Sequence, residues 1–198
     1  IAYDGIAIVT NPDTEIATLS VEQVKDIFAG DITNFSEVGG SDAEIVIVSR
    51  EEGSGTRAAF EELVMEEGDT EKVISADALL QQSNGQVRTT VASTPNSIGY
   101  LSFGFLDDST SPVPIDGASP TVANVKNGSY PIYRPLNMMT NGAPNATAKA
   151  FLDYILSDAG QELVAEDYIT VTGGDEETAE EAPAEEVGLS GQIQLAGS

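Results

Sequence analysis

The sequence predicts an α/β fold, because short runs of β-branched and apolar residues alternate with segments whose apolar residues recur at helical spacing. A length of 198 residues with 40% apolar side chains suffices for one domain or for two small lobes with real cores. The expected strands are 5–10, 44–49, 98–102 and 133–140. The expected helices are 21–29, 56–64, 85–93, 121–126 and 146–166.

The first strand and the first helix are marked by their end residues. The apolar run 5–10 is closed by Asn11 and Pro12, a pair that is typical of a turn after a buried strand. Ser20 is placed to cap the following helix with Gln23 in the capping-box position, and a glycine at position 30 ends it. The chain is therefore expected to open with a strand, a turn and a helix.

The second strand leads into a polar, glycine-containing turn and then into a helix. This turn is formed by residues 50–56, Arg-Glu-Glu-Gly-Ser-Gly-Thr. Unpaired N–H groups at such a helix start, together with the helix dipole, favour an anion. The hydroxyls of Ser54 and Thr56 add donors, and Arg50 can offer a bidentate fork to an oxyanion. The turn is therefore a candidate anion-binding site.

Two other interpretations of this turn are open from the residues alone. Ser54 or Thr56 can simply cap the helix while Arg50 pairs with a neighbouring glutamate or another carboxylate. A nucleotide-binding P-loop fits less well, because the lysine of GxxxxGK[ST] is absent and Arg57 follows Thr56 instead.

The composition excludes several kinds of chemistry. The chain has no Cys and no His, so disulfides, thiolate nucleophiles, Ser–His triads and His-ligated metals are ruled out. With 33 acidic and 8 basic side chains the net charge is −25, which disfavours nucleic acid and anionic membrane as partners. The acidic residues show no calcium-binding D-x-D-x-D-G loop. We expect no metal, no cofactor and no membrane-spanning helix.

The C-terminal part is expected to hold a helix, a linker and a strand. The helix over 146–166, broken around 158–160, should turn these apolar residues inward: Phe151, Leu152, Ile155, Leu163 and Val164. Residues 173–188 hold seven carboxylates and no basic side chain, which predicts a disordered acidic linker. Residues 189–198 alternate as a strand does, and we expect 192–196 to pair as a β-strand with the remnant of an incomplete lobe, in the same chain or in a neighbouring one.

Several motifs occur in a characteristic order. The main one covers residues 45–61, IVIVSREEGSGTRAAFE. The others are 4–9 (DGIAIV), 27–35 (IFAGDITNF), the helix–strand unit 85–100, 130–136 (YPIYRPL) and 151–160 (FLDYILSDAG). Together they resemble the phosphate-binding protein of bacterial phosphate ABC transporters, which has a type II periplasmic-binding-protein fold. The resemblance covers residues 1 to about 172.

The resemblance implies an organisation into one complete lobe and one incomplete lobe. Residues 1–172 would form the phosphate-binding-protein-like module, mostly its second lobe with the hinge strands and the C-terminal helix. Residues 173–188 would be the linker, and 189–198 the first strand of a first lobe. That strand would belong to a second tandem module or to a permuted chain.

The resemblance also implies the ligand contacts. Arg50, Ser54, Gly55 and Thr56 correspond to the phosphate contacts that the second lobe provides in the family. The opposing contacts of the first lobe, among them a carboxylate that accepts a hydrogen bond from protonated phosphate, lie in a part that this sequence lacks. Ser198 falls at or just short of the first binding hydroxyls of such a lobe, and the sequence leaves open which.

Two further arginines are expected to be structural. Arg57 lies in the first helical turn, where the dipole disfavours a cation, so it is expected to pair with a carboxylate such as Glu61. Arg134 follows Tyr133 on the return strand and is expected to form a hinge or interlobe salt bridge. The alternative for both arginines is direct contact with the anion.

The leading functional hypothesis is a solute-binding module without catalytic activity. By the resemblance it would capture inorganic phosphate between two lobes and deliver it to the membrane permease of an ABC importer. The sequence alone leaves sulfate or a related oxyanion open as the ligand. It would work at the cell surface, as a lipoprotein, or in the periplasm. One alternative is an oxyanion sensor or surface adhesion module of the same fold. Another is a hydrolase with Ser54 as nucleophile, which is disfavoured because no His is present and no Lys lies in an S-x-x-K arrangement.

Overall fold

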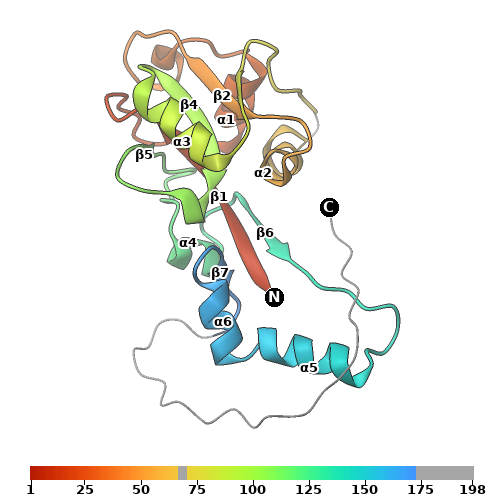
Figure 1. Ribbon diagram of the computed structural model, residues 1–198. Coiled ribbons are helices and arrows are strands. Elements are labelled where there is room, and N and C mark those ends of the chain that lie inside the picture. Colours follow the sequence, from red (N-terminus) through yellow and green to blue (C-terminus); the bar gives the residue numbers. More distant parts are fainter. Residues whose placement is uncertain (67–70, 173–198) are drawn as a thin grey trace. The chain divides into compact units, whose positions relative to one another are not determined.

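The computed structural model describes residues 1–66 and 71–172 and confirms the α/β class (Figure 1). The chain divides into two compact units. The major unit is Asp4–Arg134, and the minor unit joins Ile1–Tyr3 to the segment that starts at Pro135. The predicted acidic linker 173–188 and the predicted strand within 189–198 lie outside the described residues, as does Ser198.

The sheet of the major unit has the strand order β3-β2-β4-β1-β5. The strands are β1 (Ala2–Thr10), β2 (Val46–Arg50), β3 (Leu79–Gln81), β4 (Ser97–Ser102) and β5 (Ser111–Pro112). The pairs β2–β3 and β2–β4 are parallel, whereas β1 runs antiparallel to both β4 and β5. Because β2 and β3 are parallel neighbours, their carboxyl ends lie at the same edge, with Arg50 opposite Gln81. The short strands β3 and β5 were not among the expected elements.

Helices cover both faces of this sheet, as the alternation of side chains along β4 shows. Tyr100 packs against Phe28 of α1 (Val21–Ala29) and Phe60 of α2 (Gly55–Phe60). Its neighbour Leu101 points to the other face and packs with Val87 and Val91 of α3 (Asn84–Ser93), a cluster that also includes Ala7, Val9 and Val48. A Cβ on Gly99 would lie 2.9 Å from Val91, so a glycine is needed where α3 approaches β4.

The ends of the early elements agree with the local signals in the sequence. Ser20 caps α1, its hydroxyl accepts from the N–H of Gln23, and the Gln23 side chain accepts from the N–H of Ser20, which completes the capping box. Gly30 ends the helix in the left-handed conformation at φ 83°. The helix expected over 56–64 is α2 followed without a break by a π-helical turn, η2 (Glu61–Met65).

The remaining elements are two short turns that were not predicted, and a helix and a strand that were. The turns η1 (Phe35–Val38) and η3 (Phe103–Phe105) are 3-10 helices, and α4 (Val122–Lys126) lies at the expected position. The strand expected over 133–140 is β6 (Tyr133–Leu136), so the prediction was too long at its C-terminal end. Tyr130, just before β6, is buried, and its hydroxyl donates to the carbonyl of Ile6 at 2.7 Å, which ties this segment to β1.

The minor unit contains α5 (Ala146–Ile155), α6 (Asp158–Val164) and β7 (Ile169–Thr170). The break expected near 158–160 is confirmed, because Ser157 caps a new helix there. The expectation that Leu163 turns inward was wrong, since it is 57% exposed. The polar side chain of Gln161 organises this unit instead: its amide nitrogen donates to the carbonyls of Ile1 and Ile155, and its oxygen accepts from the N–H of Val171.

Candidate functional site

Arg50, the last residue of β2, is positioned by the neighbouring strand β4. Its N–H donates to the hydroxyl oxygen of Tyr100 at 3.2 Å, and the same hydroxyl lies 2.9 Å from the oxygen of Ser49. Burial raises the pKa of Tyr100, so the hydroxyl keeps its proton and can donate it to Ser49. The ring of Tyr100 stacks on Phe60, with centroids 4.1 Å apart. The backbone at the end of β2 is thus fixed by buried contacts.

The guanidinium of Arg50 bridges a carboxylate and an amide. Nε and Nη2 donate to the two carboxylate oxygens of Glu51 at 2.9 and 3.0 Å, and this hydrogen bonding lowers the pKa of Glu51. Nη1 donates to the side-chain oxygen of Asn84 at 3.3 Å, and the Asn84 amide nitrogen donates to the hydroxyl of Thr56, also at 3.3 Å. Asn84 therefore links Arg50 to the predicted anion-binding turn.

The turn itself begins the helix α2. Gly53 adopts φ +87°, a conformation that side chains rarely tolerate, and it brings the chain round to Ser54. Ser54 is the N-cap, and its hydroxyl accepts from the N–H of Arg57 at 3.2 Å. Gly55 and Thr56 occupy the first helical turn, where N–H groups have no partner within the helix. Their N–H groups are therefore available to a ligand, and the Ser54 hydroxyl, which accepts as a cap, still has its own O–H to donate.

Arg57 takes the structural role that was expected of it. Its Nε pairs with the carboxylate of Glu61 at 2.8 Å, one helical turn further on. Its Nη1 also donates to the carbonyl of Arg50 at 3.1 Å, so the side chain folds back over the end of β2. Arg57 thus stabilises the turn through its contacts with Glu61 and with the carbonyl of Arg50.

Arg134 also reaches this turn. Its Nη2 lies 3.5 Å from the Asp4 carboxylate, which shows that the expected salt bridge is made with β1. The same nitrogen is 3.8 Å from the point where a Cβ on Gly55 would lie. Asp4 is buried, and its other oxygen accepts from the hydroxyl of Ser102 at 2.7 Å.

The structure therefore places the described residues of the predicted anion site close together, and it places two further residues beside them. Arg50, Ser54, Gly55 and Thr56 lie in one turn, and Asn84 and Arg134 lie beside it. Sequence reasoning missed Asn84 because β3 was not recognised. The available signal was the run of Leu79, Leu80 and Gln81 before a Ser83 cap, since the carboxyl ends of adjacent parallel strands gather at one edge.

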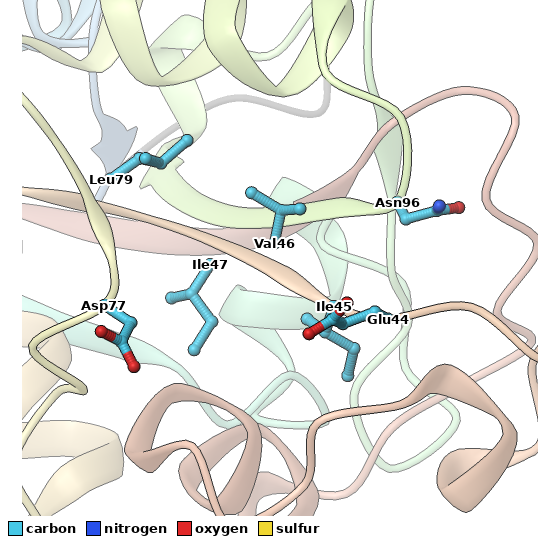
Figure 2. A pocket seen from close by; sticks show the side chains of 7 residues that line it. All are labelled: Glu44, Ile45, Val46, Ile47, Asp77, Leu79 and Asn96. Carbon is cyan, nitrogen blue, oxygen red and sulfur yellow. The ribbon is translucent and has the colours of Figure 1, made fainter.

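A pocket of about 400 Å³ lies elsewhere on the major unit. It is lined by Glu44, Ile45, Val46, Ile47, Asp77, Leu79 and Asn96, and Figure 2 shows Val46 and Ile47 pointing to opposite sides of their strand. Its charged side chains are two carboxylates with no Lys or Arg, so an anion would meet repulsion there. Within residues 1–66 and 71–172, no cluster of three or more acidic side chains is arranged to hold a metal. In the same part of the chain, no helix is long and apolar enough to cross a bilayer.

Comparisons with known proteins identify the family. Residues 1–159 match a family model described as a PBP superfamily domain. The phosphate-binding protein PstS of Bacillus subtilis is 37% identical over 175 residues, covering 87% of this chain and 57% of that protein. PstS 2 of Streptococcus agalactiae is 41% identical over 165 residues, covering 80% and 54%. The chain thus spans somewhat more than half the length of these relatives.

Solved structures agree with this assignment. An ABC-type phosphate transport receptor from Vibrio cholerae superposes with a TM-score of 0.76 at 32% identity, covering 85% of this chain and 70% of the other. A Clostridium perfringens substrate-binding protein with bound phosphate gives a TM-score of 0.73 at 42% identity, covering 86% and 70%. The chain belongs to the PBP superfamily, in its type II periplasmic-binding-protein branch, beside the phosphate-binding proteins of ABC transporters.

Proposed function

We propose that this chain carries the Arg50 and Ser54–Thr56 side of an inorganic phosphate site in a two-lobed solute-binding protein. The observation that carries the proposal is the turn itself. Free N–H groups of Gly55 and Thr56, the Thr56 hydroxyl and the Arg50 guanidinium lie within one network that Asn84 holds together. Two findings support phosphate over other oxyanions: relatives are named as phosphate-binding proteins, and the similar Clostridium perfringens substrate-binding protein was solved with phosphate.

The strongly negative net charge does not oppose this function. An anion in the turn would interact at short range with N–H dipoles and one guanidinium, whereas carboxylates more than about 10 Å away are screened by salt. The positive charge of Arg50 is balanced by the carboxylate of Glu51. Arg50 would therefore contribute mainly N–H groups that point at the anion, and little net charge.

The rest of the proposal concerns the assembly. The module would release phosphate to the membrane permease of an ABC importer and would work outside the cell membrane, at the surface or in the periplasm. It would perform no chemistry, and an oxyanion sensor of the same fold would use the same site. Joining to a second tandem module through 173–188 stays a prediction. A hydrolase gains no support, because the Ser54 hydroxyl accepts from Arg57 and has no carboxylate or Lys bonded to it among the described residues.

This chain alone should bind phosphate only weakly, with a Kd on the order of millimolar. Two-lobed binders gain affinity by closing over the ligand and excluding water, and a single side leaves half of the anion hydrated. Titration of the nitrogen-15 labelled chain with sodium phosphate should shift the amide signals of Ser54–Thr56, and sodium chloride at equal ionic strength should not. Micromolar binding would show that the opposing lobe is not needed. An absence of shifts at these amides would refute the proposed site.

A further inference from the structure

Three arginines surround the turn, and they differ in how completely the protein occupies their donors. Each of the three guanidinium nitrogens of Arg50 donates one hydrogen bond, to Glu51 or Asn84, so three of its five N–H groups are engaged. Arg57 donates through Nε to Glu61 and through Nη1 to a backbone carbonyl. Arg134 makes one ion pair at 3.5 Å, which is longer than the usual N–H···O distance of about 2.9 Å.

Arg134 also has a donor that nothing in the described chain accepts. Its Nε is buried and has no hydrogen-bond partner among residues 1–66 and 71–172. A buried donor without an acceptor is unfavourable, and a guanidinium has five N–H groups to satisfy. Among the described residues, the guanidinium fork of Arg134 therefore has fewer protein partners than those of Arg50 and Arg57.

The guanidinium of Arg134 lies close to the predicted anion-binding turn. Nη2 of Arg134 lies 3.8 Å from the point where a Cβ on Gly55 would lie. Because Gly55 has no side chain, nothing at this position separates the guanidinium from the backbone of the turn. The guanidinium is held near the turn by Asp4, which is itself fixed by the hydroxyl of Ser102. A tetrahedral oxyanion on the N–H groups of Gly55 and Thr56 would come within reach of a second guanidinium.

We propose that Arg134 is an additional oxyanion-binding residue of this site, and that Asp4 sets how much of its positive charge the ligand experiences. The inference rests on the proposed phosphate site and deepens it. Asp4 is a buried carboxylate beside the guanidinium, so it holds Arg134 in place and also offsets its charge. The two side chains should therefore have opposite effects on the binding of a dianion.

The test is titration of the full chain with inorganic phosphate at pH 8, followed at the amides of Ser54–Thr56. Arg134→Gln should weaken binding about tenfold, the loss expected for one charge-assisted hydrogen bond. Asp4→Asn should strengthen it about threefold, because the ligand loses a nearby like charge. Arg88→Gln is the matched control, since Arg88 forms an exposed ion pair with Asp107 elsewhere in the major unit, and it should leave binding unchanged.

Each outcome is decisive. If the wild-type chain gives no phosphate-dependent shifts, the proposed site and this inference fail together. If it does and Arg134→Gln binds equally well, only this inference is overturned. Weaker binding in both Arg134→Gln and Asp4→Asn would mean that the ion pair only stabilises the fold near the turn, which overturns the inference. Should Asp4→Asn not fold, Arg134→Lys decides the question. It keeps the positive charge but not the planar fork, so it should weaken binding less than Arg134→Gln does, and a loss as large as that of Arg134→Gln overturns the inference.

Discussion

Arg50→Ala should remove phosphate binding by this chain altogether. In a two-lobed protein that contains it, the loss should be about 2 to 5 kcal/mol, or about 30-fold to several thousand-fold in Kd. The side chain is only 10% exposed, and Asn84 links its guanidinium to the hydroxyl of Thr56. Its removal also leaves the Glu51 carboxylate without its partner, so an uncompensated negative charge would face the incoming anion.

Calorimetry on the two-lobed protein and amide shifts on this chain would measure the effect. Arg88→Ala serves as control, because it also deletes a paired arginine of the major unit but lies outside the turn. An unchanged phosphate affinity in Arg50→Ala would refute the role of this residue.

Phe60→Ala should give the largest loss of stability, about 3 to 5 kcal/mol in the free energy of unfolding. Phe60 is fully buried, with its ring centroid 4.1 Å from that of Tyr100 and 4.7 Å from that of Phe28. Truncation would leave a cavity between α1, α2 and β4. Because Tyr100 holds the backbone of Arg50, the cavity should also loosen the site.

Urea denaturation monitored by circular dichroism would measure this loss. Phe105→Ala is the matched control, since Phe105 is 40% exposed and its truncation should cost less than about 1 kcal/mol. Equal losses in the two variants would show that the cluster of Phe28, Phe60 and Tyr100 does not dominate the core.

Elements with local signals were predictable from the sequence. The capping box of Ser20 and Gln23 and the glycine at position 30 fix α1 within a few residues, so both ends were found. Likewise Ser54, Gly55 and Thr56 are adjacent in sequence, and their place at a helix start follows from the strand before them.

Features that depend on distant segments were not predictable in the same way. Leu79 and Leu80 are 43% and 57% exposed in a three-residue edge strand, so their pattern gives no clear period. The position of Asn84 depends on β3 pairing in parallel with β2, and that of Arg134 on the return of the chain beside β1. Leu163 was wrongly predicted to face inward. Helical periodicity shows which residues share one face of a helix, but it does not show whether another element packs against that face.

The hydrogen bonds of Gln161 have a consequence for the order of folding during synthesis. The major unit is one continuous stretch, Asp4–Arg134, so all of its contacts can form once that stretch has emerged. The minor unit needs Ile1 and Gln161, which are 160 positions apart, so it must wait for nearly the whole described chain. Closing so large a loop carries an entropic cost that favours formation of the major unit first. Pulse-labelled hydrogen exchange during refolding should therefore protect the amides of β4 before those of α6.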